Sequence, residues 1–308
     1  MKSSQAPSAV LMIRPRSFGF NSQTASTNAF QNSMKGDEET IGKTALQEFD
    51  TMVDVLRSND IDVIVVEDTD QPEKPDAIFP NNWISFHPDG SVVLYPMLAE
   101  NRRAERNIPV LKELEGHYII RQTIDLTAFE KENKFLEGTG SIVFDYVNKI
   151  AYASRSARTD ENVLKDVCQK LGYKPVVFNA VDETGQAIYH TNVLMCVGSK
   201  FAVICLDAIP QEDDQENLLE SFSTTGHKVI AISYDQMKLF AGNMIEVLSK
   251  SGEPFVLLSG KAFYSLLPGQ LDALSKFAEP IPLKIPTIEQ YGGGSVRCMV
   301  AGIFNSER

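Results

Sequence analysis

Pairs of apolar runs recur along the chain at a nearly constant spacing, and each pair is typical of two buried strands joined by a turn. The pairs span Ala77 to Tyr95, Leu136 to Ala153, Thr191 to Leu206, Asn243 to Leu258 and Ser295 to Phe304. The residues that open them lie 58, 52, 51 and 55 positions apart: Asn82, Gly140, Asn192, Asn243 and Cys298. One such unit cannot bury its apolar face alone, so the repeat predicts units that pack against their neighbours.

A helix-like segment and then a further short apolar run follow the pairs. The helical segments are Ala104 to Leu114, Asp160 to Leu171, Asp213 to Phe222 and Phe263 to Phe277, and the later runs are Tyr118 to Ile120, Pro175 to Phe178, Lys228 to Ile232 and Ile281 to Ile285. We therefore expect an α/β protein in which five units of two strands, a helix and a strand close into a ring. The alternative is an ordinary α/β protein, whose elements alternate at a similar spacing.

The two ends of the chain complete this pattern. The run Ala9 to Ile13 lacks a hairpin partner unless the run near Val300 supplies one, so both ends are expected to share a unit. No linker rich in Pro, Gly and Ser interrupts the series, which predicts a single domain over residues 1–308. The polar stretch Asn21 to Lys43 is expected to be an irregular loop at the front of the ring, either a lid or an exposed loop without function.

The net charge, the apolar runs and the cysteine count indicate which partners and cofactors are not expected. The formal net charge of −12 gives an acidic field that repels phosphate backbones, so nucleic acid is not an expected partner. Neither a leader-like start nor an apolar run of membrane-spanning length is found, which predicts a cytoplasmic protein. The four cysteines form no CxxC pair, so reduced thiols are expected, with no metal and no other cofactor.

The segment Tyr291 to Met299 holds the strongest candidate for a nucleophile. Three glycines before Cys298 allow the backbone to approach a ligand closely, and Arg297 with nearby backbone N–H groups could favour a thiolate. The alternative is a glycine turn that leads into a core strand with a small apolar cysteine.

His190 is the candidate acid and base, because it opens its strand pair in the register in which Cys298 opens another. His87 and His227 lie in turn-like contexts and are expected to be solvated. Glu137, between an apolar run and two glycines, is a candidate carboxylate, although a strand-end glutamate in water would have the same sequence context. Asp76 and Asn82 form a further polar cluster, and both are also ordinary turn residues.

These motifs resemble those of the guanidino-group modifying superfamily, the amidinotransferase and arginine deiminase relatives, whose fold is a five-bladed α/β propeller called a pentein. Phe-Leu-Glu-Gly at 135–138 is similar to the family's glutamate motif, Ser-Ala-Arg-Thr at 156–159 to its arginine motif, and Gly-Gly-Ser-Val-Arg-Cys-Met at 293–299 to its nucleophile loop. The group most similar is that of the CtlX-type citrulline utilisation hydrolases.

The resemblance implies roles for individual residues. Cys298 would be the nucleophile, His190 the general acid and base, and Glu137 the carboxylate that orients the substrate. Arg158 would grip a substrate α-carboxylate, and Arg102 is a second candidate whose alternative is a solvated charge at a helix start. Asp76, Asn82, Asn192 and Asn243 complete the expected substrate contacts.

Departures from the deiminase pattern bear on the substrate. Asn82 and Asn192 stand where deiminases have aspartates, and Gly140 stands where they have a third. Carboxylates suit a cationic guanidinium, whereas an amide offers a donor and an acceptor and suits a neutral ureido group. Succinylarginine dihydrolases of the same superfamily also use asparagines and yet accept a guanidinium.

The sequence thus predicts a hydrolase that converts citrulline to ornithine, carbon dioxide and ammonia through a covalent cysteine intermediate. Two alternatives remain open: arginine deiminase or acyl-arginine dihydrolase activity, and a non-catalytic binding protein with the same fold. A small amino acid is the expected partner, and a homodimer is one expected assembly.

Overall fold

A computed structural model describes residues 4–28, 30–32, 37–106 and 108–308. The strands of these residues form five sheets of three strands each. In order across each sheet they are β15 (Ala301–Ile303), β1 (Ala9–Arg14) and β2 (Asp62–Glu67); β3 (Ile84–Phe86), β4 (Ser91–Leu94) and β5 (Gln122–Asp125); β6 (Val143–Asp145), β7 (Ile150–Ser154) and β8 (Lys174–Phe178); β9 (Met195–Val197), β10 (Phe201–Ile204) and β11 (Lys228–Ala231); and β12 (Ile245–Leu248), β13 (Pro254–Ser259) and β14 (Glu279–Leu283).

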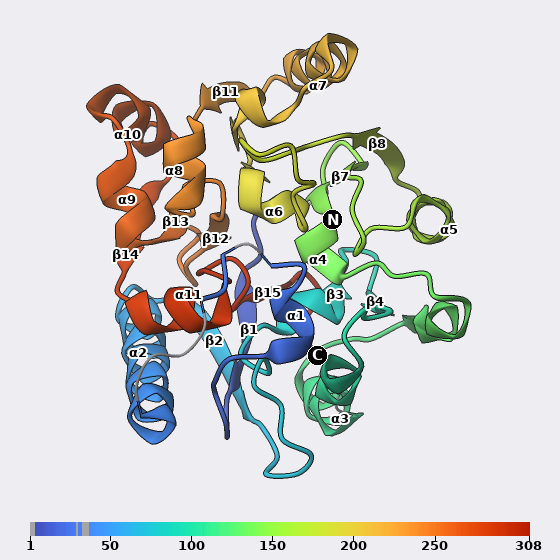
Figure 1. Cartoon of the computed structure of the whole chain (residues 1–308), viewed down its shortest axis with the longest axis vertical. Helices are drawn as coiled ribbons and strands as arrows, with labels where there is room; N and C mark the ends of the chain where they lie inside the picture. The colour runs from blue at the N-terminus through green and yellow to red at the C-terminus, as the bar shows by residue number, and fades with distance from the viewer. Residues whose placement is uncertain (1–3, 29, 33–36, 107) are drawn as a thin grey trace.

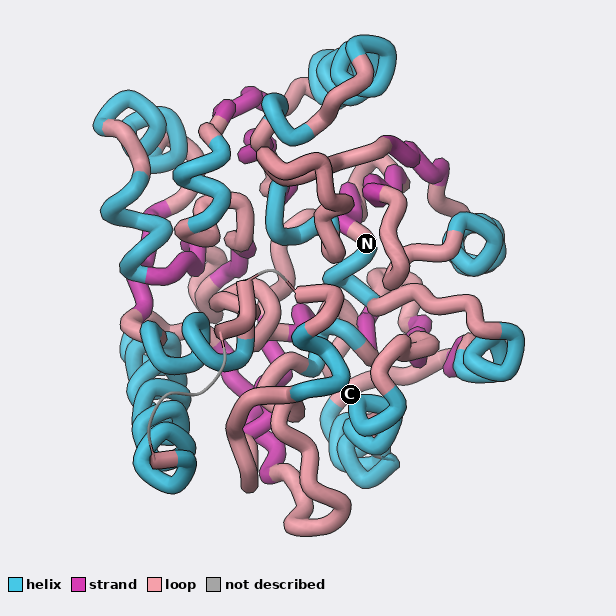
Figure 2. The backbone as a smooth tube through the Cα atoms, in the orientation of Figure 1, coloured by secondary structure: helices cyan, strands magenta, loops and turns pink. Residues whose placement is uncertain are grey.

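Each sheet repeats one connection pattern. The middle strand pairs antiparallel with one neighbour and parallel with the other, as β7 does with β6 and β8. A parallel pair needs a crossover, and helices supply it. They are α2 (Glu38–Ser58), α3 (Ile108–His117), α5 (Glu161–Leu171), α7 (Glu212–Thr225), and α9 (Gly260–Ser265) with α10 (Pro268–Ser275). These helices lie around the outer edge of the molecule, and the sheets lie inside them (Figures 1 and 2).

The ends of the described chain meet in one sheet, as the sequence predicts. β1 pairs antiparallel with β15, with Ala9 opposite Ile303 and Leu11 opposite Ala301. β1 also pairs parallel with β2, so it is the middle strand of this sheet. The apolar run Ser295 to Phe304 therefore contributes a single strand, and its partner comes from the other end.

Local sequence explains why the crossover helices start and stop where they do. At α5, the Asp160 carboxylate accepts hydrogen bonds from the N–H groups of Asn162 and Val163, and Gly172 ends the helix at φ +71°. Its apolar face, including Val163 and Val167, is buried. Burying such a side chain stabilises the fold by about 1.5–3 kcal/mol.

Some predicted boundaries are wrong, and proline explains one of them. Pro268 cannot continue a helix interior, so Phe263 to Phe277 divides into α9 and α10. The helix predicted from Ala104 is α3, which begins at Ile108. The strand predicted at Tyr118 to Ile120 is β5, four residues later at its start.

The stretch Asn21 to Lys43 is not an irregular loop throughout. It contains the short helix α1 (Ser22–Ala25), and α2 already begins at Glu38. Residues 29 and 33–36 of this stretch lie outside the described residues.

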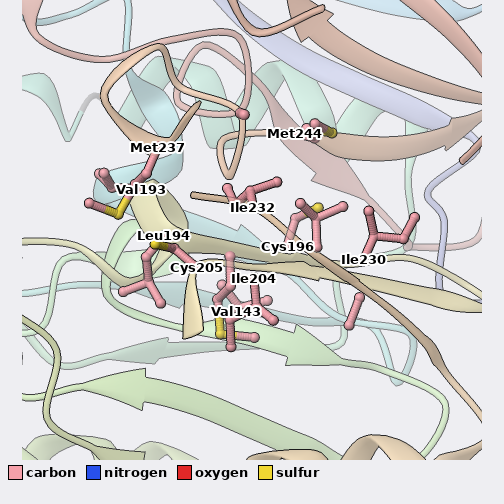
Figure 3. Close-up of a cluster of buried hydrophobic side chains, with 14 of the residues drawn as sticks. Val143, Val193, Leu194, Cys196, Ile204, Cys205, Ile230, Ile232, Met237 and Met244 are labelled. Atoms are coloured by element: carbon pink, nitrogen blue, oxygen red, sulfur yellow. The ribbon is translucent and has the colours of Figure 1, made fainter. Parts of the chain in front are cut away.

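The apolar core lies between neighbouring repeats. One cluster joins elements of three successive units and includes Val143, Leu194, Cys196, Ile204 and Met244 (Figure 3). Burial of this kind fixes the position of each sheet relative to the next. Within the described ranges, every helix is too short or too polar to cross a lipid bilayer.

His87 and His227, expected to be solvated, are buried. The His87 ring lies among Phe144, Tyr146 and Tyr173, and burial lowers its pKa to about 3. Burial likewise lowers the pKa of His227, although Asp145 opposes the shift. The turn residues around them misled the prediction, because Asp89 and Gly226 are exposed while the two histidine rings point into the molecule.

Candidate active site

The repeated register brings the opening residues of the strand pairs to one place. Asn82 ends the short helix η1 (Pro80–Asn82), Gly140 lies in α4 (Gly138–Ser141), and His190 caps α6 (Thr191–Leu194). A cavity with about 280 Å³ of empty space lies there. Six of the predicted site residues line it: Asp76, Asn82, Arg102, Arg158, His190 and Cys298. The other three, Glu137, Asn192 and Asn243, lie directly behind these side chains.

Amide groups surround the Cys298 thiol. The Nδ2 atoms of Asn243 and Asn192 lie 3.4 and 3.6 Å from its sulfur, and the side chain is 4% exposed. Gly294 passes so closely that a Cβ there would lie 3.0 Å from the Phe79 ring. A side chain at Gly294 would therefore press on that ring, which favours glycine where the backbone turns before the thiol.

The other cysteines are in a different environment. Burial among apolar side chains raises the pKa of Cys168 and Cys196 to about 12 and that of Cys205 to about 11. A thiol with so high a pKa holds its proton at neutral pH and is a poor nucleophile.

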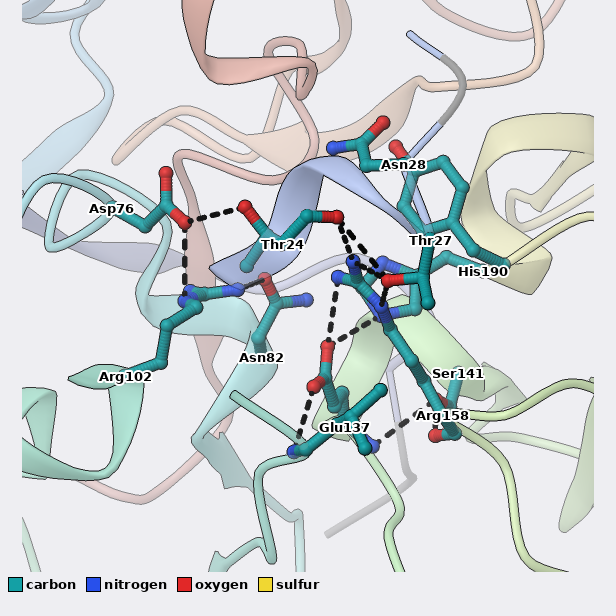
Figure 4. Close-up of polar contacts among 12 residues, drawn as sticks. Thr24, Thr27, Asn28, Asp76, Asn82, Arg102, Glu137, Ser141, Arg158 and His190 are labelled. Carbon is teal, nitrogen blue, oxygen red and sulfur yellow. Dashed lines mark hydrogen bonds and ion pairs between the residues drawn. The ribbon is translucent and has the colours of Figure 1, made fainter. Parts of the chain in front are cut away.

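Glu137 joins a histidine to an arginine. Its Oε2 lies 2.8 Å from His190 Nε2 and 3.3 Å from Arg158 Nη1, while its Oε1 accepts from the N–H of Leu98 at 3.1 Å (Figure 4). The side chain is 0% exposed, so the alternative of a solvated strand-end glutamate is wrong. Burial raises the pKa of Glu137, but Arg158 and His190 together hold it well below its ordinary value.

His190 is neutral at physiological pH. Burial lowers its pKa to about 4, against the opposing effect of Glu137. A carboxylate only accepts hydrogen bonds, so Nε2 carries the proton and donates it to Glu137. Nδ1 is therefore the unprotonated nitrogen, free to act as a base.

Arg158 is held by the segment that follows β1. Its Nη2 donates to the Thr27 hydroxyl at 2.6 Å and to the Thr24 carbonyl at 3.2 Å, and its guanidinium lies over the Tyr189 ring. The predicted grip on a carboxylate would therefore have to share these donors. Thr24, Asn28 and Tyr189 line the cavity without having been predicted, whereas the glycines before Cys298, which also line it, were expected to lie close to a ligand.

Arg102 is 3% exposed, so the alternative of a solvated charge is wrong. It forks onto Glu105 with two bonds of 2.8 Å, and its Nη1 donates to Asn82 Oδ1 at 2.9 Å. Asp76 lies 3.7 Å from Arg102 Nε (Figure 4). Asp76 also accepts a bond from Asn21 at 2.7 Å. Burial raises the pKa of Asp76, and burial raises that of Glu105 to about 7 against the effect of Arg102.

Chemically, the site combines a thiol, a neutral imidazole backed by a carboxylate, and two buried arginines. Among the described residues, no group of three or more His, Cys, Asp or Glu side chains is placed to hold a metal ion. Five repeated mixed sheets with a cysteine, a histidine and a glutamate gathered at one cavity are the features of the guanidino-modifying pentein superfamily.

The family can be stated more closely. The model of the family described as N,N dimethylarginine dimethylhydrolase, eukaryotic, matches residues 14–305. The chain therefore belongs to this family. A sequence search of curated proteins finds no match.

Solved structures share the fold. ArgZ, an arginine dihydrolase from the ornithine-ammonia cycle in cyanobacteria, has a TM-score of 0.75 at 16% identity over 97% of this chain. The chain spans only 41% of that protein. The N-terminal domain of ArgZ, solved as a cysteine-to-serine variant bound to substrate, is spanned to 98%, with a TM-score of 0.74 and 16% identity over 96% of this chain. A dimethylarginine dimethylaminohydrolase variant, solved as an adduct with S-methyl-L-thiocitrulline, has a TM-score of 0.64 at 14% identity, covering 96% of this chain and 99% of that one. These similarities establish the mixed α/β fold.

Proposed function

We propose that the chain is a cysteine-dependent hydrolase that acts on the guanidino or ureido carbon of an arginine-related small molecule. One observation carries the proposal: the thiol of Cys298 and the ring of His190 line the same small cavity, and Glu137 bonds to that ring from behind. Membership of a family described by a dimethylarginine hydrolase supports the same reaction type.

The chemistry proceeds in two halves. His190 Nδ1 takes the proton of the Cys298 thiol, and the thiolate adds to the planar carbon. The imidazolium then gives that proton to the nitrogen that leaves. With citrulline, ammonia departs and an S-carbamoyl thioester of Cys298 remains. His190 then takes a proton from water, which attacks this carbonyl and releases the thiol. The carbamate product loses carbon dioxide to give ornithine.

Citrulline is the proposed substrate because amides surround the reacting sulfur. Asn192 and Asn243 place N–H groups beside it, where a carboxylate would favour a cation. Gly140 has no side chain at the position of a third deiminase aspartate, so no negative charge is added there.

Arginine is the second candidate, and Asp76 favours it. Its Oδ1 is buried and has no hydrogen-bond partner, so it could pair with a cationic guanidinium. Two solved proteins with this fold are described as an arginine dihydrolase and a dimethylarginine dimethylaminohydrolase. Acyl-arginine remains a third substrate type in the same class.

The wider proposal is that the five sheets are the blades of a pentein propeller, that residues 1–308 form one catalytic domain, and that it works in the cytoplasm, alone or as a homodimer. The competing proposal is a non-catalytic binding protein. That role would not require the Cys298 and His190 side chains to line one cavity.

A substrate panel tests the proposal. The protein is incubated with citrulline, arginine, N,N-dimethylarginine, agmatine and N-succinylarginine, and ammonia and the amino-acid products are quantified. Ornithine with ammonia from citrulline supports the proposed reaction, and citrulline as the end product of arginine supports a deiminase. No turnover of any compound, or equal turnover by Cys298→Ala, would refute the hydrolase proposal.

A further inference from the structure

A buried arginine fixes which way the Asn82 amide points. Nη1 of Arg102 donates to Asn82 Oδ1 at 2.9 Å. A guanidinium has only donors, so the carbonyl oxygen of Asn82 must face Arg102 and the NH₂ group must point away from it. Arg102 is itself held by the two bonds to Glu105, so this orientation is rigid.

The NH₂ group of Asn82 has no partner and faces the reacting centre. Nδ2 is buried without a hydrogen-bond acceptor. A Cβ on Gly140 would lie 2.4 Å from Asn82 Nδ2 and 2.9 Å from His190 Nδ1, so both nitrogens pack closely against Gly140. Asn82, His190 and Cys298 all line the same cavity. Burying a donor without a partner is costly, and a ligand acceptor at this point would recover that cost.

The geometry points to Asn82 Nδ2 as an oxyanion donor for a ureido substrate, with Arg102 as the residue that positions it. This inference rests on the proposed function, and it adds the group that selects the substrate, the Asn82 amide. When the Cys298 sulfur bonds to the ureido carbon, the π pair of the C=O bond moves onto oxygen, and the Asn82 N–H donates to that oxygen. Re-forming the C=O bond then breaks the C–N bond, and the leaving nitrogen takes from His190 the proton that its Nδ1 received from the Cys298 thiol.

A guanidino group lacks the acceptor that this arrangement needs. The atom in the oxygen's place would be nitrogen carrying hydrogens, so two donors would face each other. A buried polar group left unpaired by the wrong substrate is a strong source of discrimination. The fixed amide therefore favours a ureido carbon over a guanidino carbon.

Asn82→Asp tests the donor directly. Aspartate keeps one oxygen for Arg102 and places the other, an acceptor, where Nδ2 was. Loss of one oxyanion donor costs about 100- to 1,000-fold in kcat, so citrulline turnover should fall by that factor with a smaller change in KM. The ratio of kcat/KM for citrulline to that for arginine should fall at least tenfold, or about 1.4 kcal/mol. Asn217→Asp, on the exposed face of α7, is the matched control.

The positioning role of Arg102 needs a paired variant, because Arg102→Gln alone leaves Glu105 without its partner. Arg102→Gln with Glu105→Gln removes both charges, and the new amide can donate to Asn82 or accept from it. The ratio of kcat/KM for citrulline to that for arginine should fall in this double variant. In the Asn82→Asp background the carboxylate has no preferred orientation, so adding the same two substitutions should leave that ratio unchanged. A merely structural role would lower both activities without this dependence.

The outcomes separate this inference from the proposed function. If the unaltered protein hydrolyses citrulline and Asn82→Asp keeps the ratio, the donor role is refuted while the hydrolase remains. If the paired variant shifts the ratio equally in both backgrounds, the positioning role of Arg102 is refuted. If the unaltered protein hydrolyses another compound of the panel but not citrulline, this inference fails while the hydrolase remains. If it hydrolyses no compound of the panel, both proposals fail. Should the paired variant not fold, Asn82→Asp with its control still decides the donor role.

Discussion

Replacing Glu137 with glutamine should impair both stability and turnover, by separate mechanisms. The Gln oxygen can still accept from the Leu98 N–H, but its NH₂ group then faces Arg158 and the His190 Nε2–H, which are both donors. Removing one partner of a buried ion pair costs about 3–5 kcal/mol. Arg158 keeps its bonds to Thr27, so we expect about 3 kcal/mol from this variant.

The same change should invert the tautomer of His190. Without an acceptor beside Nε2, the ring proton moves to Nδ1, and Nδ1 can then no longer accept a proton during the reaction. A wrong tautomer of this kind costs about 10,000-fold in kcat. Urea unfolding measures the first effect, and citrulline or arginine turnover under folded conditions measures the second.

Glu130→Gln is the matched control for Glu137→Gln. Glu130 also accepts from a backbone N–H, that of Met97, and pairs with Arg106, but it does not line the cavity. It should lose stability and keep its turnover. Turnover by Glu137→Gln within about tenfold of the unaltered protein would refute the role assigned to the carboxylate.

Three further outcomes follow from the site. Cys298→Ala should abolish turnover with an unchanged unfolding midpoint, and iodoacetamide followed by mass spectrometry should label Cys298 fastest, because burial keeps the other three thiols protonated. Gly140→Ala should lower kcat and cost about 1–3 kcal/mol, because its Cβ would press on Asn82 and His190; full activity would show that the site has room to spare. The pKa of His190 falls from 6.5 to about 4 on folding, so the unfolded chain binds the extra proton in that window and stability is lost as pH falls through it. Between about pH 7 and pH 5 the loss is about 2 kcal/mol, and urea unfolding of His190→Gln should show a correspondingly smaller pH dependence; an equal dependence would contradict the assignment.

The fold could be predicted to the level of its repeat because buried strand pairs leave uninterrupted apolar runs. The pairing of β1 with β15 followed from an unpartnered run at each end. The boundary at Pro268 was less predictable, because apolar periodicity does not register the single N–H group that a proline lacks. His87 was predicted to be solvated because it lies in a turn, but its ring is covered by aromatic side chains while Asp89 of the same turn is exposed.

The residues of the candidate site were likewise predictable only in part. Cys298 and His190 could be predicted because their common register in the repeat implies one location. The contacts of Thr24 and Thr27 with Arg158 could not, because they come from a polar stretch without periodicity. The orientation of Asn82 was equally hidden, since it depends on Arg102, which a sequence alone does not distinguish from a surface charge.

The antiparallel pairing of Ala9 with Ile303 joins residues with nearly the whole described chain between them. Contacts of such high sequence separation are costly in loop entropy and tend to form late in folding. The turn that carries Cys298 leads directly into β15, so the nucleophile is locked in place only when this last sheet is complete. Recovery of enzymatic turnover after dilution from denaturant should therefore lag behind recovery of the circular-dichroism signal of the helices. The delay would measure when β1 pairs with β15.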